Sequence, residues 1–262
     1  MLILAFEGWN DAGEAATQAV EHLIEQSGAS PFAWIDPEEF YDFTTTRPQV
    51  RIDGDQRIID WPQNRLLECR SEGQLDVVLL RGVEPQLRWR TFAAQVVEVA
   101  TTLQARLVLT LGALLADVPH SRPTPVYGTS YDQQVMEALR LDPSSYEGPT
   151  GIIGVLLDEC RQRGVPSASL WAAVPAYVAA APSPKAALAL VDRVSRLLGH
   201  PVRLGGLGEA AVAYEQQISE LVSEDPETVR YVHHLEEQHD REREPEDVDR
   251  LLAEVERFLR DQ

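Results

Sequence analysis

Short apolar runs alternate with helical patterns from the first residues of the chain to about residue 200. The run from Leu2 to Phe6 is apolar throughout, which indicates a buried strand. Apolar residues then recur in steps of three and one along residues 12–24, which fits the 3.6-residue period of a helix. Asp11 and Glu14 stand where an N-cap and a capping box place their carboxylates. Alternation of this kind is typical of a layered α/β domain.

The same patterns predict the other elements of this region. The predicted strands cover residues 32–35, 49–52, 56–59, 65–69, 76–80, 106–111 and 169–174, and the predicted helices cover residues 92–103, 153–160 and 184–198. An Asp-Gly pair at Asp53-Gly54 favours a tight hairpin turn between residues 49–52 and 56–59, so we expect a mixed sheet. Residues 115–127 contain three prolines and are predicted to be irregular.

The strand patterns stop at Glu209 and give way to amphipathic helices, with breaks expected near Pro226 and Pro245. The last 54 residues carry 17 acidic and 6 basic side chains. Their final helix is predicted to place one apolar stripe from Val248 to Leu259, which must pack on its own chain or on a neighbour. We therefore predict an α/β domain in residues 1–203, an acidic helical segment in residues 204–262, and a homo-oligomer.

Composition restricts the partners and the location of the protein. Of 262 residues, 44% are hydrophobic and 25% are charged, as in globular proteins. The net charge of −19 argues against a nucleic-acid partner. The chain lacks a signal-peptide pattern and an uncharged apolar run long enough for a membrane span. Cys69 and Cys160 lie far apart in the sequence and match no metal-binding spacing, which favours free thiols in a cytoplasmic protein without a metal or another cofactor.

Several enzyme classes are excluded because their motifs are missing. Lys185 is the single lysine and is not part of a Walker A sequence, and the chain holds no G-x-S-x-G or H-E-x-x-H motif. Glu236 and His239 form one E-x-x-H pair close to His233 and His234, but one pair is more consistent with a solvated helix face than with a metal site.

Three polar loops follow predicted strands, at the edge of an open α/β sheet where ligands usually bind. They begin at Glu7, Gly82 and Asp117. The candidate pocket residues in and beside them are Glu7, Asn10, Asp11, Glu84, Trp89, Asp117, His120 and Arg122. The simpler interpretation of Asp11 is that it only caps a helix. A fourth candidate is the helix start at Thr150 and Gly151, whose free backbone N–H groups would attract an anion.

Five segments together resemble one known family. They are Glu7 to Gly13, Gly82-x-Glu84-Pro85 with Trp89 and Phe92, Leu114 to Pro123, Gly148 to Ile152, and Leu170 to Pro175. They are similar to the bacterial, actinobacterial-type branch of the proteasome assembly chaperone 2 family, most of whose members are uncharacterised. The resemblance implies a three-layer α/β/α fold like that of nucleoside phosphorylases and peptidyl hydrolases, and a cyclic oligomer, with a trimer favoured. It supplies no catalytic residues.

Two functions remain open from the sequence. The first is a non-enzymatic assembly chaperone or scaffold that binds a protein client, which fits the missing catalytic motifs. The second is a small-molecule enzyme or sensor for an anionic or nucleoside-like ligand. In that case His120 would serve as acid and base, Arg122 would clamp an anion, and Glu7, Glu84 or Asp117 would supply carboxylates. We also expect Glu7, Asn10, Glu84, Asp117, His120 and Arg122 to gather in one cleft at one end of the sheet.

Overall fold

A mixed seven-stranded sheet forms the centre of the molecule, in a computed structural model that describes residues 1–69 and 76–241. The strand order is β2-β5-β6-β1-β7-β9-β8. The strands are β1 (Leu2–Glu7), β2 (Ser30–Ile35), β5 (Asn64–Cys69), β6 (Val77–Val83), β7 (Val108–Ala116), β8 (Val126–Thr129) and β9 (Ser167–Pro175). Strands β6, β1, β7 and β9 are parallel, whereas β5 is antiparallel to β2 and β6, and β8 is antiparallel to β9.

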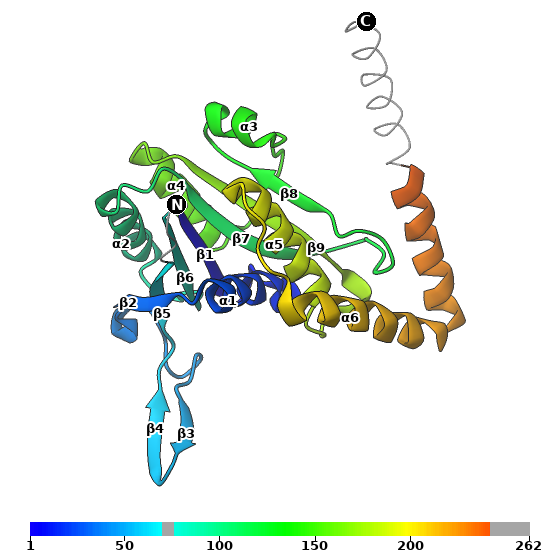
Figure 1. Cartoon of the computed structure of the whole chain (residues 1–262), viewed down its shortest axis with the longest axis horizontal. Coiled ribbons are helices and arrows are strands. Elements are labelled where there is room, and N and C mark those ends of the chain that lie inside the picture. Colours follow the sequence, from blue (N-terminus) through cyan, green and yellow to red (C-terminus); the bar gives the residue numbers. More distant parts are fainter. Residues whose placement is uncertain (70–75, 242–262) are drawn as a thin grey trace, which may run out of the picture.

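Helices cover both faces of this sheet (Figure 1). The α-helices are α1 (Ala15–Ser27), α2 (Trp89–Thr102), α3 (Gln133–Leu139), α4 (Ile152–Gln162), α5 (Pro184–Leu198) and α6 (Gly205–Ser223), and the 3-10 helices are η1 (Ala12–Glu14), η2 (Pro37–Glu39) and η3 (Ala176–Val178). α1 and α5 bury Val20 and Leu190 on one face, and α2 and α4 bury Phe92 and Leu156 on the other. The expected three-layer α/β/α fold is confirmed.

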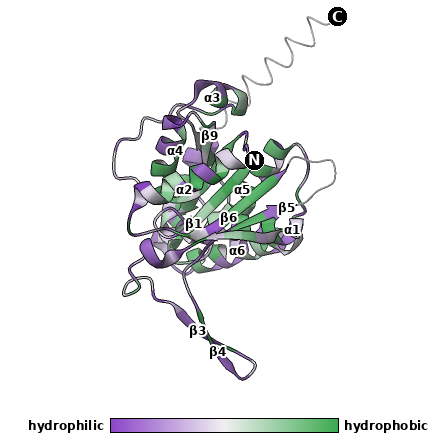
Figure 2. Ribbon diagram, turned by 90° about the vertical axis from the view of Figure 1, so that its left-hand side faces the viewer, coloured by the Kyte–Doolittle hydropathy of each residue, from purple (hydrophilic) through white to green (hydrophobic). Residues whose placement is uncertain are grey.

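The hydrophobic pattern of the strands follows from their place in the sheet. β1 pairs with β6 and β7 on its two sides, and the side chains of Leu2 to Phe6 are buried on both faces. A parallel strand at such a position is apolar at every residue rather than at every second one. Figure 2 shows this concentration of hydrophobic residues on the central strands.

The predicted hairpin is present, but it does not join the central sheet. β3 (Gln49–Asp53) and β4 (Gln56–Asp60) form a separate two-stranded sheet that projects from the body (Figures 1 and 2). Gly54 at its turn has a φ of 60°, a conformation that glycine adopts without strain. The sheet is mixed for a different reason from the one predicted, because β5 and β8 are the strands that run opposite to the other five.

The prediction that residues 115–127 are irregular is wrong at both ends. β7 continues to Ala116, and β8 begins at Val126, directly after the last of the three prolines. Helix α3 was also not predicted. Proline is tolerated next to a short edge strand. The three prolines therefore lie in the loop between β7 and β8, and they do not prevent β8 from forming.

The C-terminal helical segment starts with α6, which packs along α5. The expected break near Pro226 is present, because a second helix covers residues 226–241 after an interruption at residues 224 and 225. Asp225 caps this helix by accepting hydrogen bonds from the backbone N–H groups of Glu227 (3.3 Å) and Thr228 (3.0 Å). The predicted stripe from Val248 to Leu259 lies outside the described residues. Within the described part of the chain, no helix combines the length and apolar character that a membrane span requires.

Candidate functional site

The six residues expected to share a cleft divide into two groups with different partners. The loop after β1 lies beside Ala113, whose N–H donates to the Asn10 carbonyl at 2.8 Å. β7 continues for three more residues beyond Ala113, to Ala116 paired with Pro175. At about 3.3 Å per residue, the loop after β7 therefore leaves the sheet roughly 10 Å beyond the loop after β1. Glu7, Asn10 and Glu84 belong to the inner group, and the outer group is Asp117, His120 and Arg122.

The Glu84 carboxylate organises the inner group. Its Oε1 accepts hydrogen bonds from Asn10 Nδ2 at 2.7 Å and from the Ile152 backbone N–H at 2.8 Å, and its Oε2 accepts one from the Trp9 N–H at 3.3 Å. Ile152 is the first residue of α4, so Glu84 occupies the helix start predicted to attract an anion. The anion at this position is a carboxylate of the chain itself.

Glycine is required at position 151 because neighbouring side chains lie too close to leave room for a Cβ atom. A Cβ atom on Gly151 would lie 2.4 Å from both terminal atoms of Asn10 and 2.7 Å from Glu84 Oε1. The hydroxyl of the other candidate at this helix start, Thr150, donates to the Gly151 carbonyl at 3.4 Å. The segment from Thr150 to Ile152 is therefore closely packed against the Glu84 carboxylate.

The remaining inner candidates also bond within the chain. Asp11 accepts hydrogen bonds from the N–H groups of Ala16 (2.7 Å) and Thr17 (3.3 Å) and from the Thr17 hydroxyl, so it caps α1, and burial raises its pKa. The predicted capping box does not form, because Glu14 is itself the N-cap residue of α1 and lies outside the helix. Trp89 donates from Nε1 to the Pro85 carbonyl at 2.5 Å and packs against the core.

The inner group also includes an exposed ion-pair chain. Glu7 lies 2.9 Å from the Arg81 guanidinium, which is also 2.9 Å from Glu21. These side chains are between 29% and 45% exposed, so the pairs contribute little to stability.

The outer group contacts the C-terminal helices. Asp117 accepts a hydrogen bond from the Tyr231 hydroxyl at 2.8 Å. Arg122 binds both carboxylate oxygens of Asp240 at 2.8 Å and lies 3.3 Å from Glu236. Hydrogen bonding to Asp240 raises the pKa of the Arg122 guanidinium further. Arg122, which is predicted to bind an anionic ligand, binds two carboxylates of the same chain in this structure.

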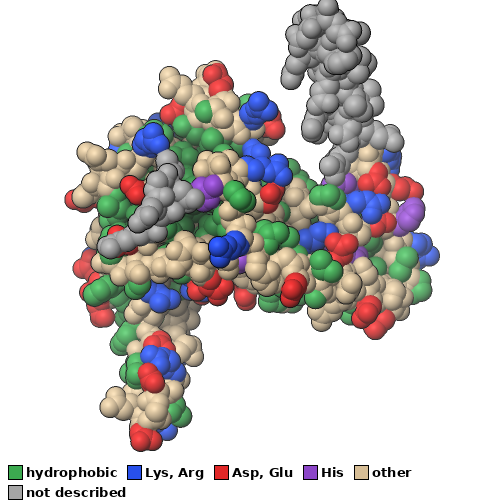
Figure 3. All heavy atoms as spheres, in the orientation of Figure 1, with side chains coloured by type: hydrophobic (Ala, Val, Ile, Leu, Met, Phe, Trp, Pro, Cys, Tyr) green, Lys and Arg blue, Asp and Glu red, His purple; other side chains and the backbone are tan. Residues whose placement is uncertain are grey.

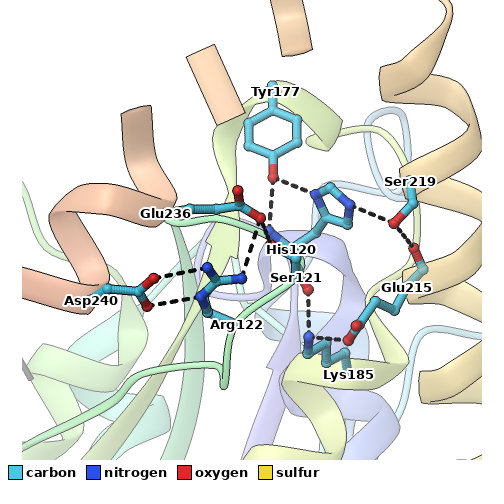
Figure 4. Close-up of polar contacts among 9 residues, drawn as sticks. All are labelled: His120, Ser121, Arg122, Tyr177, Lys185, Glu215, Ser219, Glu236 and Asp240. Carbon is cyan, nitrogen blue, oxygen red and sulfur yellow. Dashed lines mark hydrogen bonds and ion pairs between the residues drawn. The ribbon is translucent and has the colours of Figure 1, made fainter. Parts of the chain in front are cut away.

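We call this contact region the loop–helix interface. Its residues are Asp117, His120, Ser121, Arg122, Tyr177 and Lys185 on the body, and Glu215, Ser219, Tyr231, Glu236 and Asp240 on the helices. Figure 4 shows most of these side chains pointing toward one another. In Figure 3, acidic, basic and histidine side chains lie along the C-terminal helices at the right of the molecule. An apolar cluster of Val178, Tyr214, Ile218, Val222 and Val232 completes the contact.

His120 lies at the centre of this interface, and both of its ring nitrogens have hydrogen-bond partners. The Ser219 hydroxyl donates to the Glu215 carbonyl at 2.8 Å, so it accepts from His120 Nε2 at 3.0 Å. The Tyr177 oxygen accepts from the His120 backbone N–H at 2.8 Å and also lies 2.8 Å from Nδ1. This arrangement fits a neutral imidazole that carries its proton on Nε2. Burial and the nearby Lys185 lower its pKa.

Lys185 forms hydrogen bonds both to the loop that contains His120 and to α6. Its ammonium donates to the His120 carbonyl and to the Glu215 carboxylate, and its side chain is only 16% exposed. No sequence pattern indicates this role of the single lysine, because its partners lie 65 and 30 residues away.

A groove of about 260 Å³ lies beside His120, between α6 and the helix of residues 226–241. Its lining residues are His120, Ser121, Ser219, Val222, Ser223, Val229, Val232, His233 and Glu236. His120 is the single candidate pocket residue among them. Within residues 1–69 and 76–241, no three His, Cys, Asp or Glu side chains are grouped as a metal ion requires.

The neutral state of His120 leads to a pH prediction. Because burial lowers its pKa below the ordinary 6.5, the unfolded chain binds more protons than the folded chain between these two pKa values. The His120 contribution to the free energy of unfolding is therefore expected to fall as the pH drops below about 6.5 and to level off below the folded-state pKa. Urea denaturation between pH 7 and pH 5 measures it as the difference between the wild type and His120→Gln. Parallel pH profiles for the two proteins would contradict the prediction.

The fold and this interface define the class of protein: a three-layer α/β/α protein in which the loop after β7 is bound by the C-terminal helices of the same chain. The PAC2 family model matches residues 5–222, and the chain belongs to this family. Among curated proteins, no sequence matches the chain.

Solved structures agree with the family. A PAC2 family protein from Streptomyces avermitilis is 45% identical, with a TM-score of 0.83 and coverage of 88% of this chain and 98% of that chain. A proteasome-assembly chaperone homologue from Mycobacterium tuberculosis is also 45% identical, with a TM-score of 0.80 and coverage of 88% and 99%. An archaeal proteasome activator from Pyrococcus furiosus shares the fold at 19% identity and a TM-score of 0.68, covering 84% of this chain and 92% of that chain.

Proposed function

We propose that this protein is a non-enzymatic, assembly-chaperone-like protein that binds a protein client, and that a proteasome subunit or assembly intermediate is this client. Its similarity to the mycobacterial proteasome-assembly chaperone homologue over 88% of the chain supports the proposal. The observation that carries it is the loop–helix interface, because the side chains best suited to catalysis, His120 and Arg122, are bonded to the chain's own helices. We further propose that the protein acts in the cytoplasm as a homo-oligomer, with a trimer favoured.

Reconstitution with purified components tests the client. The protein is mixed with purified proteasome α- and β-type subunits of its own organism, and native mass spectrometry follows the complexes formed. We expect a defined complex with one subunit type or with an assembly intermediate at about 10 µM, where an interaction of micromolar Kd is populated. No complex and an unchanged assembly rate would contradict the proposed function.

The small-molecule alternative has no specific structural observation in its favour. A thermal-shift screen with nucleosides, nucleotides, amino acids and phosphate distinguishes it, because a ligand at 100 times its Kd adds about 2.7 kcal/mol to the free energy of unfolding. We expect no shift. A shift that Arg122→Ala removes would instead establish a ligand site at the loop after β7.

A further inference from the structure

The two edges of the central sheet differ in how they are protected. β2 and β8 are the edge strands (Figure 1). β2 contains Pro31, and its pairing with β5 shifts between Pro31 and Ala33. A proline and an irregular register both prevent a further strand from pairing, and natural proteins use them for this purpose. The β2 edge is therefore blocked.

The β8 edge has neither a proline nor a register shift within the strand. Residues 123–131 carry no charged side chain, and the two prolines among them, Pro123 and Pro125, precede the strand. The pairing of β8 with β9 runs in register from Val126 to Thr129. The short length of β8 limits pairing to a short segment of another chain, and its regular, uncharged backbone leaves that pairing open.

The register shows which backbone groups are available on β8. The Ala173 N–H donates to the Pro125 carbonyl at 3.0 Å, so hydrogen-bonded pairs alternate from there along the ladder. Tyr127 and Thr129 consequently bond to β9, whereas the N–H and C=O groups of Val126 and Gly128 point away from it. Within the described residues these outward groups have no hydrogen-bond partner.

Side chains on both faces of β8 offer contacts next to these groups. Gly112, Trp171 and Tyr127 lie side by side on β7, β9 and β8, so they share one face of the sheet. The Trp171 ring packs over Gly112, and Tyr127 is 52% exposed. On the opposite face, the Leu141 side chain lies against Gly128. A strand added to β8 would meet an aromatic surface on one side and leucine on the other.

We infer that the β8 edge binds an extended segment of a partner polypeptide by strand addition. The inference deepens the proposed function and rests on it for the protein client. Outward N–H and C=O groups at alternate residues match another extended backbone, and main-chain hydrogen bonds are the basis of such recognition.

The size and charge of the surface favour a peptide segment over a second copy of the chain. Two outward residues on a four-residue strand offer far less contact than the roughly 800 Å² per partner of a standard interface between folded proteins. A second copy would also carry the same net charge of −19. The partner segment is therefore expected to hold β-branched or aromatic residues, to lack proline, and to carry basic residues at its ends.

A proline on β8 tests the inference. Val126→Pro removes an N–H that points away from β9, so the ladder within the protein keeps its hydrogen bonds. Val126→Ala is the matched control, because it loses similar side-chain packing and keeps the N–H. The probe is a fluorescein-labelled heptapeptide, Arg-Thr-Val-Tyr-Val-Thr-Arg, titrated by fluorescence anisotropy. Circular dichroism and thermal melting confirm that both variants fold.

We expect the wild type and Val126→Ala to bind the peptide within about threefold of one another and Val126→Pro to bind at least tenfold more weakly. Equal binding by Val126→Pro and Val126→Ala, or no binding to the wild type, would overturn the inference. So would a dimer in light scattering that Val126→Pro alone dissociates, because a second copy would then occupy the edge. A proteasomal client that binds Val126→Pro normally would overturn the inference and leave the proposed function standing.

Discussion

Replacing Glu84 with alanine is expected to lower the free energy of unfolding by about 3 kcal/mol, because the change removes the acceptor of two well-formed hydrogen bonds at once. The Asn10 amide is 1% exposed and would lose its bond to Glu84. The Ile152 N–H would lose its bond as well, and α4 would lose the negative charge at its N-terminus. Urea denaturation at pH 7 measures the change.

Glu84→Gln is the control for this prediction. It retains an oxygen that can accept from Asn10 and Ile152, and it loses the charge and the bond from the Trp9 N–H. A loss of about 1 kcal/mol is expected. If the alanine and glutamine variants were equally stable, Glu84 would not be acting as the shared acceptor.

The second large effect is expected for Gly82→Ala, at about 3 kcal/mol of lost stability. A Cβ atom at Gly82 would lie 1.6 Å from Asn64 Oδ1 and 3.0 Å from the Asn64 Cα. Asn64 is fully buried and donates to the Tyr41 hydroxyl, which in turn donates to the Val83 carbonyl at 2.6 Å. The amide therefore cannot move aside without breaking this chain of hydrogen bonds.

A glycine in open surroundings provides the comparison. Nothing lies within 4 Å of a Cβ atom built on Gly206 in α6. Gly206→Ala is expected to leave stability unchanged or to raise it by up to about 1 kcal/mol, because alanine favours helix. Thermal melting of the two variants side by side measures both effects, and similar melting temperatures would contradict the close-packing argument.

The sequence predicted the strands and helices whose patterns are long and regular. β1 is apolar throughout because it is buried on both faces, and α5 follows a serine cap at Ser183 with a proline in its first turn. β8 was missed because a strand of four residues beside prolines has too short a pattern to recognise. The hairpin of β3 and β4 was predicted, but no local pattern indicates that it stays outside the sheet.

The candidate site was predicted less completely, because its partners come from distant parts of the chain. Loops at the carboxyl edge of a parallel sheet are polar and were found from that pattern. Whether such a loop binds a ligand or the protein itself depends on residues such as Ser219 and Asp240, which lie 99 and 118 positions beyond their partners. The apolar face of an amphipathic helix indicates that the helix packs against another part of the protein. The pattern does not indicate which loop the helix contacts.

Hydrogen exchange of the helix of residues 226–241 tests most directly whether Arg122 and His120 hold the protein's own helices rather than a ligand. Arg122→Ala removes the bidentate bond to Asp240, and its matched control is Arg196→Ala, which removes an exposed ion pair within α5. We predict exchange about fivefold faster in residues 226–241 of Arg122→Ala, which corresponds to about 1 kcal/mol for a partly exposed bidentate pair. A larger increase is expected when His120→Ala is added, with protection in α2 and α4 unchanged. Equal protection of residues 226–241 in Arg122→Ala, Arg196→Ala and the wild type would contradict the account.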